Sequence, residues 1–151
     1  MNSPIQGHES SSDEQDLSAD YPSDKTPAIR VVMMPRDTNA LGTIFGGVIL
    51  SEIDLAAAIE AHRYHSGRIA TVAMDRIEFK RPVFVGDLVS FFTDTVRVGT
   101  TSVTVKVSVW AQRRFGSHVR VPVTEATVTM VAVGEDGQKV PLERIHPVDI
   151  G

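Results

Sequence analysis

The stretch "GTIFGGVILSEIDLAAAIEAHRY", Gly42 to Tyr64, begins as a glycine-rich turn and continues as a run of alanine, leucine, isoleucine and glutamate. No proline interrupts the chain from Gly47 to about His65, and these residue types favour a helix, so the sequence predicts a helix of about five turns there. His65-Ser66-Gly67 is expected to end the helix, with Arg63 near the negative end of its dipole.

One carboxylate on this predicted helix, Asp54, lies among small and aliphatic residues on the side that is expected to be buried. It follows Gly47 by seven residues, about two helical turns, so both residues lie on one face of the helix. Burying a lone carboxylate is costly unless the group is paired or hydrogen-bonded. Two interpretations stay open from spacing alone: a structural acid satisfied by a neighbouring Ser, Thr or Arg, and an acid that takes part in chemistry.

The glycine pair Gly46-Gly47 also has two interpretations. It can serve only a tight turn and close packing. It can also present free backbone N–H groups at the positive end of the helix dipole, where a developing negative oxygen is stabilised. Such a helix start, combined with Asp54, suits acyl transfer to water. The chain has no cysteine and no G-x-S-x-G elbow, which disfavours a thiol or serine nucleophile of that type.

Length and charge divide the chain unequally. A chain of 151 residues suits one domain with a real core. Residues 1–27 contain six acids and one base, a charge of −5, whereas residues 28–151 contain thirteen acids and fourteen bases, a charge of +1. The first segment is rich in Ser, Asp and Pro, so we predict a disordered acidic tail over 1–27, a folded domain over 28–145 and a C-terminal tail over 146–151.

The composition also limits which partners and which cellular locations are expected. An acidic tail argues against nucleic-acid binding, and no apolar run approaches the ~18 residues of a membrane span. The absence of cysteine is compatible with a reducing compartment, and a cytoplasmic location is predicted. No pair of histidines has convincing metal spacing, so no metal site is predicted.

Beyond Gly67 the pattern changes to strands. Long stretches alternate apolar and polar residues, which is typical of antiparallel strands with one covered face. The expected strands lie within 28–34, 68–80, 88–98, 103–114 and 118–133. The sequence therefore predicts an α+β fold, in which a five- to six-stranded antiparallel sheet wraps around one long central helix. One helix leaves sheet edges open, so edge-to-edge dimerisation is expected.

The runs "MPRDTNALGTIFGGVILSEIDLAAA" and "TVAMDRIEFKRPVFVGD" closely resemble the acyl-CoA thioesterases of the hotdog fold, nearest to the bacterial YciA-type hydrolases. The Asp-Thr-Asn-Ala turn, the glycine pair, the aspartate seven residues later and the Phe-x-x-Pro-x-x-x-Gly-Asp run occur in order, and the resemblance covers about residues 31–141. It implies hydrolysis of acyl-CoA to a free acid and coenzyme A, with no further cofactor. The main alternative is a non-catalytic module that senses acyl-CoA; a hotdog dehydratase is disfavoured because no histidine occupies the motif position.

The resemblance also assigns roles to residues. It implies that Asp54 is the general base or nucleophile, that Asn39 faces this aspartate across a dimer interface, and that Gly47, with Gly46 beside it, polarises the thioester carbonyl. Phe45 stands where many hotdog thioesterases have histidine. The implied active unit is a homodimer, further assembled as a trimer of dimers. Contacts to coenzyme A are predicted at Arg81, Arg97, Thr101 and Ser102.

Other polar residues receive structural interpretations. Glu52 and Glu60 are expected on the solvent side of the helix, Arg113 on the surface, and Asp87 as a cap or pin of its turn. Trp110 and Phe115 are candidates for an interface.

Overall fold

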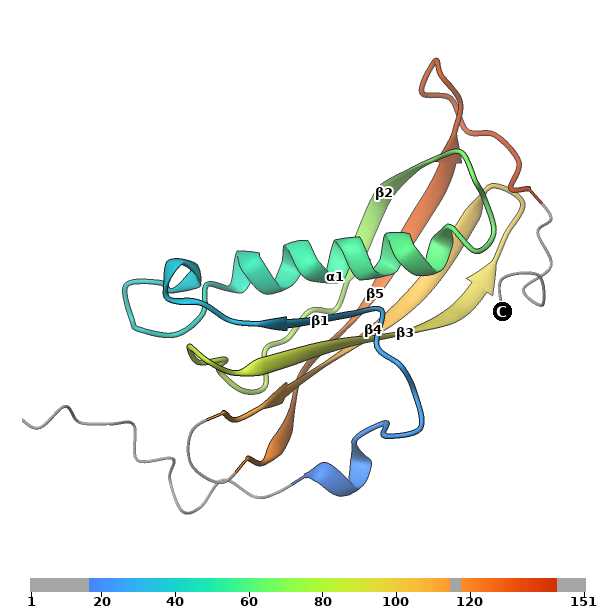
Figure 1. The fold of residues 1–151 in the computed structure, drawn as a ribbon. Coiled ribbons are helices and arrows are strands. Elements are labelled where there is room, and N and C mark those ends of the chain that lie inside the picture. Colours follow the sequence, from blue (N-terminus) through green and yellow to red (C-terminus); the bar gives the residue numbers. More distant parts are fainter. Residues whose placement is uncertain (1–16, 115–117, 144–151) are drawn as a thin grey trace, which may run out of the picture.

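One long helix, α1 (Gly46–Ala61), lies against one face of a five-stranded antiparallel sheet (Figure 1). The computed structural model describes residues 17–114 and 118–143. The strands are β1 (Ile29–Val32), β2 (Arg68–Asp75), β3 (Leu88–Val98), β4 (Ser102–Gln112) and β5 (Arg120–Val133), and two 3-10 turns, η1 (Ser18–Asp20) and η2 (Pro35–Asp37), precede the helix. The predicted α+β architecture with one central helix is confirmed.

The strand order in the sheet is β1-β3-β4-β5-β2, so β1 and β2 are the two edge strands. The central strand β4 pairs with β3 and β5 over its whole length, and its residue Val105 lies opposite Thr95 on one side and Val128 on the other. This long register brings the alternating valines of β4 to the helix side of the sheet.

The core lies between α1 and the sheet. Its largest contribution from the sheet is the row Val103, Val105, Val107 and Val109 of β4, each at most 1% exposed. The buried apolar residues of α1 are Ile49, Ile53, Ala56, Ala57 and Ala61. Burial of one isoleucine side chain contributes about 1.5–3 kcal/mol, and the alanines let the helix approach the sheet closely.

The helix ends one turn earlier than predicted. Its C-cap is His62, and the next two residues close tight turns, with Arg63 N donating to Glu60 O and Tyr64 N to Ala61 O. These i to i+3 bonds satisfy the last carbonyl groups of the helix, so the chain can turn before the expected stop at Ser66-Gly67.

The predicted acidic tail differs from the structure in its second half. Residues 1–16, the C-terminal tail 146–151 and Phe115 lie outside the described residues, but residues 17–27 contact the face of the sheet opposite α1 (Figure 1). The Tyr21 ring packs edge-on against Phe92 at 5.4 Å and Trp110 at 5.5 Å, and the Arg120 guanidinium lies 4.2 Å from the Tyr21 ring centroid. One aromatic residue thus supplies the burial that the average composition of the segment lacks.

An open flank remains beside β2. Strand β2 has a bulge between Thr71 and Ala73, and the intervening Val72 is 57% exposed. On α1, Leu55 and Ile59 are 55% and 50% exposed. Within the described ranges, no helix is both long and apolar enough to cross a membrane.

Candidate active site

The start of α1 is built from a braced loop. Ile44 N donates to Val83 O at 2.8 Å and Phe45 N donates to Asp37 O at 2.7 Å, so both flanking segments fix the point at which the helix begins. The N-cap residue is Phe45, whose side chain makes no capping hydrogen bond. Gly46 and Gly47 are the first two residues of the helix, so their N–H groups have no carbonyl acceptor within the helix. They are available to a ligand oxygen at the positive end of the helix dipole.

Asn39 closes the loop that leads into the helix. Its Oδ1 accepts hydrogen bonds from Leu41 N at 2.8 Å and Thr43 N at 3.2 Å, and its Nδ2 donates to Thr43 Oγ1 at 3.0 Å. Backbone bonds between Asn39 N and Thr43 O and between Gly42 N and Asn39 O complete the turn. Within one subunit, Asn39 therefore holds the loop shape, and one of its two Nδ2 hydrogens remains for a further acceptor.

Asp54 lies at the margin of the core and is only partly buried. Its Oδ1 accepts a hydrogen bond of 2.5 Å from Thr71 Oγ1 on β2. Because β2 is an edge strand, this contact places the carboxylate beside the open side of the sheet. The initial expectation of a buried position is corrected: the buried stripe of α1 passes through Ile49, Ile53 and Ala57, next to Asp54.

The buried acid of α1 is Glu60, which is 8% exposed, so its assignment to the solvent side is wrong. Its carboxylate accepts hydrogen bonds from Thr93 Oγ1 at 3.1 Å, Thr95 Oγ1 at 2.8 Å and Arg63 Nη1 at 2.9 Å. Tyr64 Oη donates to the same Thr95 hydroxyl. These partners offset the desolvation of the charge, and they account for Glu60 as a structural residue.

Asp54 and Gly47 of one chain cannot act on the same carbonyl group. Seven residues of α-helix separate them by about 10 Å along the axis, whereas a base and an oxyanion donor must each lie about 3 Å from the reacting atoms. Both residues nevertheless lie near the side of α1 that faces β2 and the residues after it.

The predicted coenzyme A contacts occupy two distant regions. Arg81 lies two residues before Val83, which hydrogen-bonds the start of α1, whereas the second half of β3 contacts the other end of the helix through Thr95 and Tyr64. A helix of 16 residues is about 24 Å long, so Arg81 and Arg97 are not brought together within one chain.

Arg97 and Ser102 also lie on the outer face of the sheet. Arg97 pairs with Thr104 and Ser102 pairs with Val131, each one step from the inward-facing Val103. Successive residues of a strand point to opposite faces, so both side chains are on the face away from α1. Thr101 lies in the β3–β4 turn, where its carbonyl accepts Ala132 N.

Asp87 pins its turn as predicted, with Oδ2 accepting Phe84 N at 2.9 Å. Arg113 is not on the surface: it is 4% exposed and pairs with the Asp87 carboxylate. This buried ion pair holds the loop whose Val83 carbonyl braces the start of α1. Across 17–114 and 118–143, no group of three His, Asp or Glu side chains could hold a metal ion. Trp110 is 8% exposed and covered by Tyr21, so part of its surface is used within the chain.

Comparison with known proteins identifies the family. Residues 41–114 match the sequence model described as the Thioesterase superfamily. The chain is 40% identical to the acyl-CoA thioester hydrolase YciA of Salmonella typhimurium over 125 residues, which cover 79% of this chain and 94% of the relative. The chain belongs to the thioesterase superfamily. This result confirms the family indicated by the resemblance of the two runs that contain the Asp-Thr-Asn-Ala turn, the glycine pair, the aspartate and the Phe-x-x-Pro-x-x-x-Gly-Asp pattern.

Solved structures of thioesterases share the fold. Cj0915, a hexameric hotdog-fold thioesterase of Campylobacter jejuni, is 46% identical with a TM-score of 0.75, over 80% of this chain and 92% of that chain. HI0827, a hexameric broad-specificity acyl-coenzyme A thioesterase, is 36% identical with a TM-score of 0.76, over 83% of this chain and 86% of that chain. The predicted hotdog fold is confirmed.

Proposed function

We propose that this thioesterase-superfamily chain hydrolyses the thioester of acyl-CoA, releasing a free acid and coenzyme A. The observation that carries the proposal is the position of Asp54, a partly buried carboxylate on α1 that lies beside the edge strand β2, together with the two uncapped glycines that begin the same helix. Relatives that are 40% identical over most of their length carry the name acyl-CoA thioester hydrolase.

The proposed reaction needs one base and one oxyanion site. Asp54 takes a proton from water, and the resulting hydroxide attacks the carbonyl carbon of the thioester. The N–H groups of Gly47 and Gly46 stabilise the negative oxygen of the tetrahedral intermediate. The C–S bond then breaks, and the thiolate of coenzyme A takes the proton that Asp54 holds, which restores the base. The site's own groups thus provide both functions, and no cofactor enters the proposal.

The site is proposed to be shared between two subunits. Gly47 and Asn39 come from one chain and Asp54 from the other, because about 10 Å of helix separates Asp54 from its own Gly47. The remaining Nδ2 hydrogen of Asn39 is available to the partner's carboxylate or to the attacking water. A homodimer is then the minimal active unit, and a trimer of dimers agrees with the hexameric relatives.

Substrate contacts remain proposals of the same kind. Arg81 and the group Arg97, Thr101 and Ser102 lie at opposite ends of α1, so one bound coenzyme A would contact them from different subunits. A cytoplasmic location remains part of the proposal.

The test is release of free thiol from a panel of acyl-CoAs. Asp54→Asn is expected to lower kcat by about 10²- to 10⁴-fold, because the amide cannot accept the proton. Asn39→Ala is expected to lower activity as well, and Glu52→Gln on the same helix serves as the matched control. Undiminished hydrolysis by Asp54→Asn would refute the mechanism. Acyl-CoA binding without turnover by the wild type would instead favour the sensing module.

A labelling experiment separates the two roles of Asp54. In a single turnover in ¹⁸O-water, a pure general base leaves the label only in the product acid. A nucleophile passes through a mixed anhydride, and attack of water on its aspartyl carbon places the label in the Asp54 carboxylate. Mass spectrometry of the peptide that contains Asp54 reads the result.

A further inference from the structure

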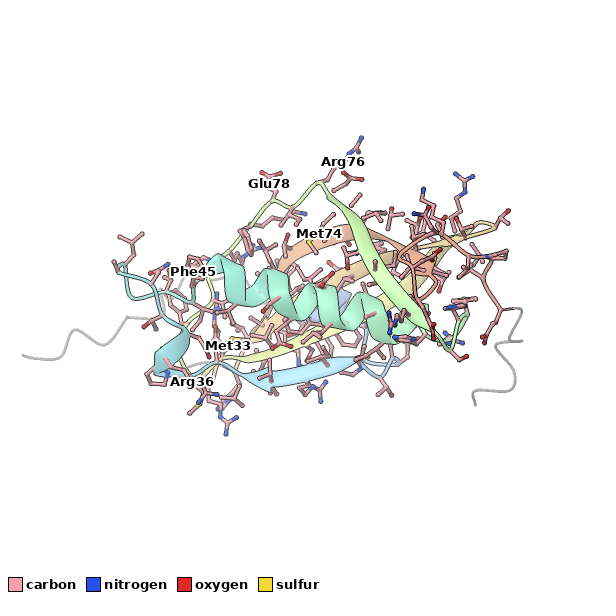
Figure 2. The ribbon with its side chains drawn as sticks, turned by 90° about the horizontal axis from the view of Figure 1, so that it is seen from above. Met33, Arg36, Phe45, Met74, Arg76 and Glu78 are labelled. Carbon is pink, nitrogen blue, oxygen red and sulfur yellow. The ribbon has the colours of Figure 1, made fainter. Side chains whose placement is uncertain are left out.

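Two exposed aromatic rings flank the glycine pair at the start of α1. Phe45 is 58% exposed and Phe79 is 44% exposed, so both rings present apolar surface beside the helix start. A Cβ atom built on Gly47 would lie 2.4 Å from Phe45 Cε1, and one built on Gly46 would lie 3.5 Å from Phe79 Cε2. The rings therefore lie directly against the residues that carry the proposed oxyanion donors. Figure 2 shows Phe45 beside the first turn of the helix.

The position of the Phe45 ring also requires glycine at position 47. Any side chain at position 47 would occupy the space of the ring, so the absence of Cβ lets an aromatic residue lie over the helix start. Phe45 has no polar atom with which to cap the helix, unlike the Ser, Thr, Asp and Asn residues that favour this position. The chain thus combines free N–H groups with an apolar covering next to them.

Phe79 belongs to the segment that leaves the strand bound to Asp54. Phe79 follows β2 by four residues, and Asp54 hydrogen-bonds Thr71 of β2. If a thioester carbonyl oxygen binds to Gly47 N, the first methylene groups of its acyl chain would lie near both rings, because they are only a few bonds from that oxygen. Alkyl groups gain free energy from such burial, about 0.8 kcal/mol for each CH₂, whereas a polar ligand would gain little.

We propose that Phe45 and Phe79 contact the acyl group beside the thioester and thereby favour substrates with longer alkyl chains over short ones. The proposal rests on the proposed function, because it uses the thioester position that the glycine N–H groups define. The occupant of the apolar surface is the acyl chain of the substrate. With an acyl chain bound against them, the rings would also limit the access of water to the oxyanion donors, which strengthens the interaction of these donors with the developing charge.

The experiment compares octanoyl-CoA with acetyl-CoA in Phe45→Ala and Phe79→Ala. Loss of either ring is expected to lower, by about tenfold, the ratio of kcat/KM for octanoyl-CoA to kcat/KM for acetyl-CoA. The octanoyl chain loses its contact with the ring, whereas the acetyl group makes little contact in either protein. Val96→Ala is the matched control, because Val96 is 59% exposed near the far end of β3 and is expected to leave the ratio unchanged.

Each outcome decides the point. An unchanged ratio in both variants overturns the proposal. A fallen ratio accompanied by dissociation of the oligomer, measured by light scattering, also overturns it, because the rings would then serve the subunit interface. If the wild type hydrolyses neither substrate, the proposed function fails separately, and the same ratio is measured as dissociation constants for the two acyl-CoAs.

Discussion

Glu60 of α1 has structural hydrogen-bond partners, and stability measurements can compare it with Glu52 on the same helix. Glu60 is buried with three hydrogen-bond donors, so Glu60→Ala removes the acceptor and leaves the Thr93 and Thr95 hydroxyls short of a partner. The free energy of unfolding is expected to fall by about 1–3 kcal/mol. Glu52→Ala, on the same helix, is the control and is expected to change it by less than about 0.5 kcal/mol. Equal effects in urea titrations would contradict the structural role.

The sequence could not rank Asp54 and Glu60 by burial. At 100° per residue, the two positions lie about 120° apart around the helix axis, and apolar residues occur on most sides of α1, including the exposed Leu55 and Ile59. A broad apolar surface does not indicate which flank faces the sheet. The glycine pair and the family resemblance point to Asp54. The structural role of Glu60 depends on Thr93 and Thr95, which are more than thirty residues away in the chain and so leave no local signal.

At the scale of elements, the segment 17–27 offers a direct optical test. Trp110 is the only tryptophan of the chain, and Tyr21 covers it on the outer face of the sheet. Tyr21→Ala is expected to shift Trp110 emission to longer wavelength, as water reaches the indole, and to lower the free energy of unfolding by about 1–3 kcal/mol.

Tyr21→Phe is the matched control for the same segment. It keeps the ring but loses the hydrogen bond that Arg30 Nη2 donates to Tyr21 Oη, so the emission should stay close to that of the wild type. Identical spectra for wild type and Tyr21→Ala would contradict a docked segment. Alternation predicted the long strands and a short β-rich run predicted the first one. One aromatic anchor in a polar segment, in contrast, leaves no periodic signal.

Glu143, near the C-terminal end of the described chain, makes a contact with Ser66 that is expected to depend on pH. Ser66 Oγ and Ser66 N donate hydrogen bonds to the Glu143 carboxylate, and they lower its pKa below the ordinary value of 4.5. A lowered folded-state pKa stabilises the fold above the unfolded-state pKa, and this contribution is lost as the pH falls through the folded-state value. Glu143→Gln should therefore be less stable than the wild type at about pH 7, and the difference should shrink below 4.5.

Denaturant titrations over this pH range measure the difference for Glu143. Glu135→Gln, at an exposed turn position, is the control and should show little change at any pH. A stability difference between wild type and Glu143→Gln that persists undiminished at about pH 3 would rule out the carboxylate as its source.

At the scale of the whole molecule, the proposed sharing of the site between two subunits predicts complementation between two variants that are each expected to be inactive. Asp54→Asn removes the base, and Gly47→Val places a side chain at the oxyanion donor, against the ring of Phe45. In a mixed dimer, one site combines the intact Gly47 of the first variant with the intact Asp54 of the second, while the other site carries both changes.

Random co-assembly gives half mixed dimers, each with one intact site of two, so about a quarter of the wild-type rate should return. Thiol release from the co-expressed variants measures the rate, and native mass spectrometry verifies the mixed dimers. Each variant assembled alone is the control. Mixed dimers without activity would show that Asp54 and Gly47 must come from the same chain, and a site within one subunit would then have to bridge about 10 Å of helix.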